Sequence, residues 1–305
     1  MDIKAEYQNA VNSNDLEKAK YWLSKFEFID PPFDTHIPDL FRKGKKVIAT
    51  LDSTREPSED ELIVVYGNYP IWHYSMPFSS KMYRHITYFW DISHDDVEYH
   101  PCWEKIDQIY IINLEKRYER YVETLLELAK VQAPLHRVIH NKVVNTGEDP
   151  TINAARQHIQ IIDQFKKSNK DFCMIFEDDF TFISDINHVW NSLTLFFERN
   201  YDFEVLLLGT SKYNQRCEYD DLLTLSKQSC TNASGYILCK NTIDSVIAVV
   251  NSGFEQFLAN PGIPWEYGFD QYWRRLTKRF FCRKKLGFQR IGYSDVGQRI
   301  NATLD

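Results

Sequence analysis

The stretch Phe172-Cys173-Met174-Ile175-Phe176 runs directly into three carboxylates, Glu177-Asp178-Asp179. An unbroken apolar run is typical of a strand that is buried on both faces of a sheet in an α/β protein. In open α/β sheets, ligands bind beyond the carboxyl ends of the strands. Three successive carboxylates repel one another, so local stability gives no reason to place them there. The junction therefore predicts both the fold class and the position of a functional site.

Carboxylate oxygens suit Mg²⁺ or Mn²⁺, which commonly bridge protein groups and substrate phosphates. Because side chains alternate along an extended segment, Glu177 and Asp179 are expected on one side and Asp178 on the other. A solvated acidic turn or a helix cap is the alternative interpretation. The apolar strand immediately before the triplet favours a metal site.

Strands and helices alternate on both sides of this junction. Apolar runs predict strands at 109–113, 137–139 and 205–209, and amphipathic periodicity predicts helices at 118–130, 152–167 and 187–198. This alternation predicts an α/β fold with a mostly parallel sheet flanked by helices.

The first hundred residues follow another pattern. Residues 2–25 are expected to be helical, with Asn14 or Asp15 capping a second helix, and strands are expected at 47–51, 61–67 and 84–90. We therefore predict an N-terminal α+β extension over 1–104 and a main domain over 105–305. Three roles are open for the extension: completing the sheet, covering the acceptor side of the functional site, or binding a partner.

A second candidate site lies at 112–120, where the first strong strand meets a helix. Backbone N–H groups at such a junction attract anions, and Lys116, Arg117 and Arg120 add positive charge. An exposed helix with ordinary charge pairs is the alternative interpretation.

Charge and apolar composition argue against several classes of protein. The 305 residues carry 36 basic and 43 acidic side chains, a net charge of -7, which argues against binding duplex nucleic acid. No segment has the roughly 20 apolar residues of a membrane span, and the start does not resemble a signal peptide. We expect a cytoplasmic protein, with peripheral membrane association left open, and free thiols at its six scattered cysteines.

Asn-Leu-Glu-Lys-Arg-Tyr-Glu-Arg at 113–120 and Met-Ile-Phe-Glu-Asp-Asp at 174–179 together resemble motifs of family 25 glycosyltransferases. That family includes lipopolysaccharide-modifying sugar transferases and collagen galactosyltransferases. Segments 203–209, 235–238, 269–270 and 294–296 are similar to its later motifs in the same order, so the resemblance covers roughly 106–298. The family usually has a helix bearing Gly-Cys and Ser-His before the acidic motif. In this chain the corresponding segment, 152–158, keeps only His158.

The resemblance implies a GT-A fold, a nucleotide-sugar donor (a UDP-sugar), Mn²⁺ or Mg²⁺, and a glycan, glycoprotein or collagen-like acceptor. It implies that Asp179 contacts the metal directly, that Glu177 contacts the metal or the ribose, and that Asp295 is a late acidic ligand. The donor-side candidates are Asn113, Leu114, Arg117, Asp178 and His158. A lone helical histidine such as His158 is also commonly structural.

An inverting transfer needs a carboxylate that takes the proton of the attacking hydroxyl. We assign this role to Asp270, where the family has its late Asp, with Glu266 in reserve and with Trp265 and Tyr267 available to stack on a sugar. The alternative for Asp270 is the N-cap of a helix over 271–278. The basic residues at 274–285 form either a solvated face or a surface for an anionic acceptor or a membrane.

The leading hypothesis is thus a metal-dependent glycosyltransferase. The first alternative is a catalytically silent GT-A-like domain that binds glycans or proteins. The second is a sugar-phosphate nucleotidyltransferase, which needs a Gly-rich loop after its first strand, whereas this chain has no glycine between Ile106 and Thr146.

Overall fold

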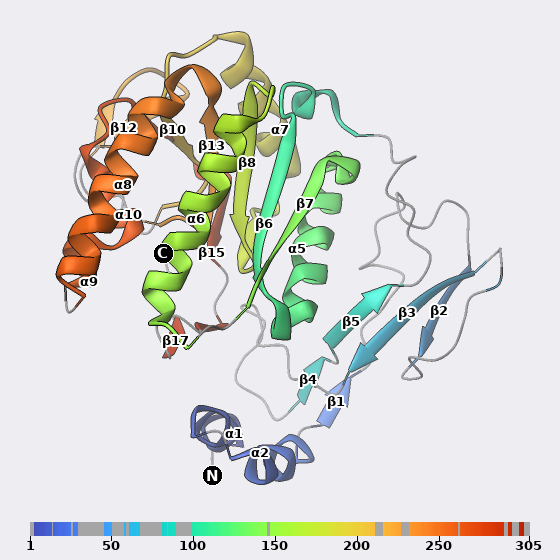
Figure 1. Cartoon of the computed structure of the whole chain (residues 1–305). Helices are drawn as coiled ribbons and strands as arrows, with labels where there is room; N and C mark the ends of the chain where they lie inside the picture. The colour runs from blue at the N-terminus through green and yellow to red at the C-terminus, as the bar shows by residue number, and fades with distance from the viewer. Residues whose placement is uncertain are drawn as a thin grey trace.

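The computed structural model describes residues 3–13, 15–25, 27–29, 46–50, 58, 61–67, 81–83, 85–89, 99–144, 147–210, 216–226, 232–261, 263–289, 292–294 and 299–301. A central sheet with helices on both faces dominates it (Figure 1).

The central sheet has eight strands, and most of them run in the same direction. From edge to edge they are β11 (Arg216–Glu218), β12 (Leu223–Ser226), β14 (Arg279–Cys282), β10 (Val205–Leu207), β13 (Gly235–Cys239), β8 (Phe172–Glu177), β6 (Gln108–Leu114) and β7 (Val138–Val143). β6 is parallel to β7 and β8, and β10 is parallel to β14. β13 lies antiparallel between β8 and β10, and β12 lies antiparallel between β11 and β14. Within this sheet β13 and β12 oppose the other strands, so the predicted mostly parallel sheet is confirmed.

Each face of the sheet buries its own apolar cluster. Along β6, Ile109 and Ile111 point into the cluster formed with α5 (Tyr118–Lys130) and α7 (Ile186–Glu198). Tyr110, between them, belongs to the cluster formed with α6 (Pro150–Lys167) and α8 (Ile243–Ala259). All three residues are fully buried, which explains why their run is continuously apolar instead of alternating.

The predicted helices of the main domain match the structure closely, and α6 and α7 begin at side-chain caps. The carboxylate of Asp149 accepts the N–H groups of Thr151 and Ile152 at the start of α6, where Pro150 occupies a first-turn position. Asp185 caps α7 in the same way by accepting from His188.

One late helix was predicted wrongly. Instead of a helix over 271–278, the chain forms α9 (Pro264–Tyr267), α10 (Phe269–Tyr272) and a 3-10 turn over Trp273–Arg275, and then enters β14 at Arg279. The apolar run that follows the basic residues is needed as a buried strand between β10 and β12. Tertiary pairing thus ends the helical segment early.

The described N-terminal helices, and the three strands expected at 47–51, 61–67 and 84–90, match their predictions. The described N-terminal strands form sheets of their own. α1 (Ile3–Asn12) and α2 (Leu16–Leu23) are separated near Asp15, whose carboxylate accepts the N–H of Lys18. β2 (Lys46–Thr50), β3 (Glu61–Gly67) and β5 (His85–Phe89) make a three-stranded sheet, and β1 (Glu27–Ile29) pairs with β4 (Lys81–Tyr83).

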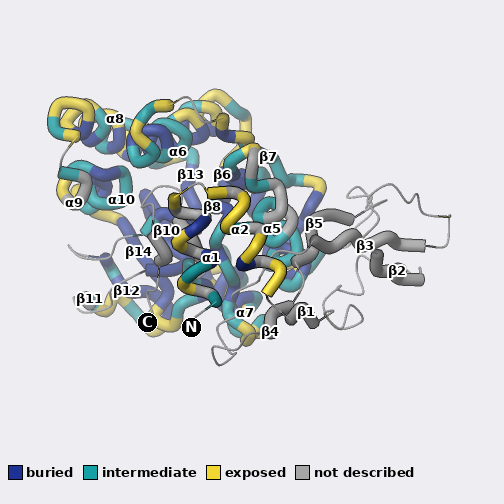
Figure 2. Tube along the Cα trace, turned by 90° about the horizontal axis from the view of Figure 1, so that it is seen from below, coloured by how far each residue is buried: buried dark blue, intermediate teal, exposed yellow. Residues whose placement is uncertain are grey.

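The described N-terminal strands therefore do not complete the central sheet. β5 lies beside α5, and the α1–α2 pair lies beyond the edge at which β6 and β8 end (Figures 1 and 2). The boundary near residue 104 stays a prediction.

Two further expectations concern cysteines and membranes. The cysteines that the structure describes carry free thiols, as predicted: Cys102, Cys173, Cys217, Cys239 and Cys282. Among the described helices, none has the length and apolar character required to cross a bilayer.

Candidate active site

The three carboxylates at the end of β8 have different partners. Asp178 turns toward β6 and α5, where Asn113 and Arg120 contact it. Asp179 accepts a hydrogen bond of 2.9 Å from Nε2 of Gln289. Glu177 contacts His158 of α6. Glu177 is the last residue of β8, and Asp178 and Asp179 form the turn that follows it.

Asp178 is enclosed by protein donors. Its Oδ2 accepts from Nδ2 of Asn113 at 2.8 Å, and its Oδ1 lies 3.3 Å from Nη1 of Arg120 in a largely buried ion pair. Its backbone carbonyl accepts from the Thr124 hydroxyl at 3.2 Å. Asp178 therefore fastens the end of β8 to β6 and α5 in this structure.

Asn113 is committed to the same network. Its Nδ2 also donates to the carbonyl of Arg117 at 2.8 Å, and its Oδ1 lies 3.0 Å from Nε2 of His140. The His140 ring stacks on Tyr121 at 3.6 Å between centroids, and burial lowers the pKa of His140 to about 4. Asn113 is 1% exposed, so its side chain holds the strand ends together at this position. Its contact with a nucleotide stays a prediction.

Asp179 keeps one oxygen with no donor. Its Oδ1 is buried and has no hydrogen-bond partner among the described residues. Burial, together with the nearby charges of Glu177 and Asp178, raises the pKa of Asp179 to about 7. A bound cation would favour the ionised form of Asp179 and so offset the effect of burial and of the neighbouring negative charges.

A phenylalanine wedge sets the position of Asp179. Phe180 starts the short strand β9 (Phe180–Phe182), which pairs with β15 (Gly287–Gln289). A Cβ added at Gly235 would lie 2.6 Å from the Phe180 ring, and one at Gly287 would lie 2.2 Å from it. The two glycines thus leave the space that the ring fills, and the β9–β15 pair brings Gln289 to Asp179.

Sequence reasoning missed Gln289. The residue lies 110 positions from Asp179 in the chain, in a three-residue strand that carries no periodic signal. A glycine before an aromatic residue at 287–288 is the only local sign of close packing there.

Glu177 is held from the side of α6. Its Oε1 lies 3.1 Å from Nε2 of His158, and Nδ1 of His158 lies 2.8 Å from the hydroxyl of Tyr236 on β13. The Glu177 N–H donates to the carbonyl of Ser234, a fully buried residue whose Oγ lacks a partner among the described residues.

The charges of Glu177 and His158 act on Asp270. Burial raises the pKa of Asp270, the charge of Glu177 raises it further, and His158 acts in the opposite direction. Its neighbour Phe269 stacks on the His158 ring at 4.5 Å between centroids. Asp270 lies inside α10, whose N-cap is Gly268, so the alternative interpretation of Asp270 as an N-cap is wrong.

The reserve carboxylate, Glu266 in α9, is exposed. Leu114 packs against the cluster beneath α6, and Arg117 ends the 3-10 turn Glu115–Arg117. Asp295 and the side chain of Trp265 lie outside the described residues.

The described residues fit a divalent cation in part. No three His, Cys, Asp or Glu side chains within the described ranges are arranged to hold a metal alone. Mg²⁺ commonly takes one or two protein carboxylates and completes its shell with water and substrate phosphates. Glu177 and Asp179 match that pattern, because no described Lys or Arg pairs with either of them and Oδ1 of Asp179 lacks a donor.

Most of the basic residues between 274 and 285 are already engaged. Lys278 pairs with Asp202, Arg283 with Glu218 and Lys284 with Asp185. Two more cations lie over aromatic rings: Arg275 over Tyr272, and Lys285 over Phe288. The exposed members of the run therefore form a solvated face whose charges are paired with nearby carboxylates or aromatic rings, whereas Arg279 is fully buried in β14.

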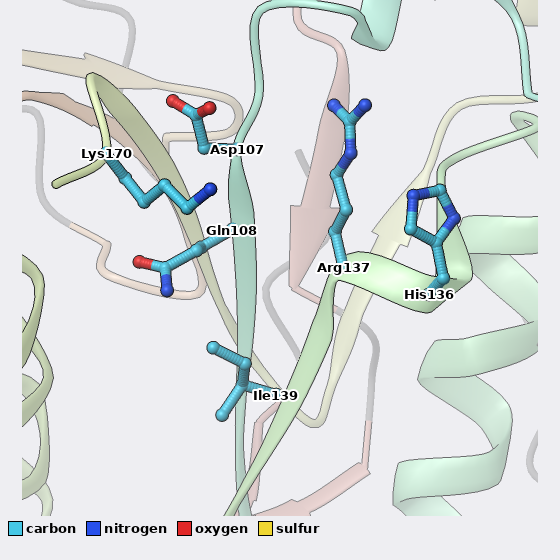
Figure 3. A pocket seen from close by; sticks show the side chains of 6 residues that line it. All are labelled: Asp107, Gln108, His136, Arg137, Ile139 and Lys170. Atoms are coloured by element: carbon cyan, nitrogen blue, oxygen red, sulfur yellow. The ribbon is translucent and has the colours of Figure 1, made fainter. Parts of the chain in front are cut away.

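An open pocket of about 410 Å³ lies at the opposite, amino-terminal edge of the strands (Figure 3). It is lined by Asp107, Gln108, His136, Arg137, Ile139 and Lys170. Nη1 of Arg137 donates to the carbonyls of Trp103, Glu104 and Ile106, and Asp107 accepts two backbone N–H groups just before β8. These charges anchor the starts of strands, so we do not place the active site there.

Comparisons with known proteins give little beyond the fold. No protein-family model and no curated protein matches the chain, so the resemblance to family 25 glycosyltransferases stays a prediction from motifs. Among solved structures, the chain is similar to mannose-1-phosphate geranyltransferase from Thermus thermophilus, with 11% identity and a TM-score of 0.38, over 58% of this chain and 73% of that chain. A TM-score this low supports no inference about activity.

Proposed function

We propose that this chain is a metal-dependent glycosyltransferase with a GT-A-like domain. It would move a sugar from a nucleotide-diphosphate sugar, with a UDP-sugar as the expected donor, to a hydroxyl group of a glycan or protein. The observation that carries the proposal is the difference in partners at the end of β8. Asp178 is paired with Arg120, whereas no Lys or Arg in the described chain forms an ion pair with Glu177 or Asp179.

A divalent cation held by Glu177 and Asp179 would neutralise the charge that develops on a diphosphate leaving group. The strand-to-helix junction at Leu114 lies on the neighbouring strand end and is the expected place of the nucleotide. Asp178 acts behind it by holding β8, β6 and α5 at a fixed spacing.

Asp270 is the proposed base of an inverting transfer. Its raised pKa makes the carboxylate a better proton acceptor than an exposed aspartate, and the charge of Glu177 contributes to that raised pKa. It would take the proton from the acceptor hydroxyl as that oxygen attacks the sugar.

The proposal is tested by measuring UDP binding by calorimetry with Mn²⁺ and with a chelator. We expect Mn²⁺ to strengthen binding in the wild-type protein and in Asp163→Ala, a control carboxylate on α6, but not in Asp179→Ala. Equal affinity with metal and with chelator in the wild type would contradict the proposal. A screen of nucleotide sugars for metal-dependent hydrolysis then names the donor.

A catalytically silent domain that binds glycans or proteins is the second candidate. Two observations favour it: the described residues lack a complete metal cage, and Asn113 and Asp178 are committed to internal hydrogen bonds. Glycan binding that does not depend on metal, with no hydrolysis of any nucleotide sugar, would favour this candidate.

A further inference from the structure

His158 joins three elements of the main domain at the candidate site. It lies on α6, Glu177 ends β8 and Tyr236 belongs to β13. The three side chains form a continuous chain of two hydrogen bonds, 2.8 Å from Tyr236 to Nδ1 and 3.1 Å from Nε2 to Glu177.

When the His158 ring is neutral, the chemistry of Glu177 and Tyr236 fixes which atom donates and which accepts in each of the two hydrogen bonds. An ionised carboxylate only accepts hydrogen bonds, so Nε2 of His158 must carry the proton that faces Glu177. Nδ1 is then an acceptor, and the Tyr236 hydroxyl donates to it. Tyr236 thereby selects the tautomer that His158 needs in order to donate to Glu177.

Packing keeps the ring in this orientation. His158 is 2% exposed and Tyr236 is fully buried. Phe269 stacks on the other side of the His158 ring, with planes 14° apart, and the next residue along is Asp270. A turn of the ring would break both hydrogen bonds and remove the surface on which Phe269 rests.

We propose that His158 is a positioning residue, held by Tyr236, that orients the Glu177 carboxylate for a divalent cation. This inference rests on the proposed metal-dependent function, and it gives His158 a role different from the donor contact expected from the sequence. Partners of this kind behind a metal ligand typically change metal affinity by about 10–100-fold when they are removed.

A matched pair of substitutions separates this role from simple packing. In His158→Gln the amide nitrogen lies near the place of Nε2 and keeps a donor for Glu177. In His158→Asn the amide lies near the place of Nδ1, so the partner of Tyr236 is kept and the donor to Glu177 is lost. Both variants remove the ring from Phe269, so a packing role predicts similar losses in both.

The measurement is Mn²⁺ affinity in the presence of UDP, by calorimetry, alongside the thermal midpoint. We expect His158→Asn to bind Mn²⁺ at least about tenfold more weakly, His158→Gln to remain within about threefold of the wild type, and Tyr236→Phe to fall between them. His136→Gln, an exposed histidine at the opposite edge of the sheet, is the control and should match the wild type. Equal Mn²⁺ affinity in the Asn and Gln variants would overturn the proposal.

A second readout does not depend on metal, activity or the stability of these variants. Nitrogen-15 NMR of the wild-type imidazole is expected to show His158 as the Nε2–H tautomer, and Glu177→Gln should shift its Nε2 signal while leaving that of His136 in place. An Nδ1–H tautomer would overturn the positioning role even if metal binds. A wild type that shows the Nε2–H tautomer but no metal-dependent UDP binding would refute the proposed function and leave the hydrogen-bond chain standing.

Discussion

Nδ2 of Asn113 donates a hydrogen bond of 2.8 Å to Oδ2 of Asp178, joining the ends of two neighbouring strands that are 65 residues apart in the chain. Both side chains are buried, at 1% and 9% exposure. Removing the donor leaves part of a buried carboxylate unsatisfied, which typically costs about 1–3 kcal/mol. We therefore expect Asn113→Ala to lower the free energy of unfolding by about that amount.

Urea denaturation checks this expectation, with Asn251→Ala on the exposed side of α8 as the control. The control should change the free energy of unfolding by less than about 0.5 kcal/mol. If the two variants are equally stable, the Asn113–Asp178 contact does not hold the strand ends together.

The raised pKa of Asp179 predicts a pH dependence of stability. The pKa of about 7 in the folded chain lies above the ordinary 3.8, so the folded state binds this proton more tightly than the unfolded state. Below pH 4 both states are protonated, and the contribution of the group is lost as the pH rises toward 7. Without metal, Asp179→Asn should therefore be more stable than the wild type at pH 8, by about 1–2 kcal/mol, and much closer to it at pH 4.

Chemical denaturation at both pH values, in the presence of a chelator, measures this difference. Asp163→Asn on α6 serves as the control for a change of charge. A difference between Asp179→Asn and the wild type that is the same at pH 4 and pH 8 would show that Asp179 does not carry a raised pKa.

Asp270→Asn tests the proposed base. Loss of general-base assistance should lower the rate of sugar transfer by about 10²–10⁴-fold while donor affinity stays nearly unchanged. Glu266→Gln, on an exposed carboxylate in the preceding helix, should retain activity. Transfer assays and donor titrations separate the two effects, and wild-type transfer by Asp270→Asn would move the role to Glu266 or Asp295.

Gly235→Ala tests the wedge that sets the position of Asp179. The added Cβ would lie 2.6 Å from the Phe180 ring, so the ring and its neighbour Asp179 must move. Overpacking of this kind typically costs about 1–3 kcal/mol, and we expect weaker Mn²⁺-dependent UDP binding as well. The double variant Gly235→Ala/Phe180→Leu should recover part of the loss of binding. A recovery of stability without any recovery of binding would show that the packing of Phe180 does not set the position of Asp179.

The sequence by itself was enough to locate the main layers of the fold. Continuous apolar runs at 109–112 and 172–176 indicated strands covered on both faces, and amphipathic periodicity placed α5, α6 and α7. The same apolar run also placed the three carboxylates at the end of a buried strand. These features depend on neighbouring residues, so local pattern carries them.

Tertiary structure alone decided which side chains meet. Nothing in the sequence indicated that Gln289 would reach Asp179, or that Tyr236 would hold His158 against Glu177, because these contacts join strands and helices far apart in the chain. Tertiary structure likewise decided that residues 279–282 form β14, because they are buried between β10 and β12. Entry into this strand ends the preceding helical segment in spite of its local helical tendency. Periodicity reports which face of an element is buried, whereas only the register and packing of the completed sheet determine the partner that each buried or half-buried polar group finds.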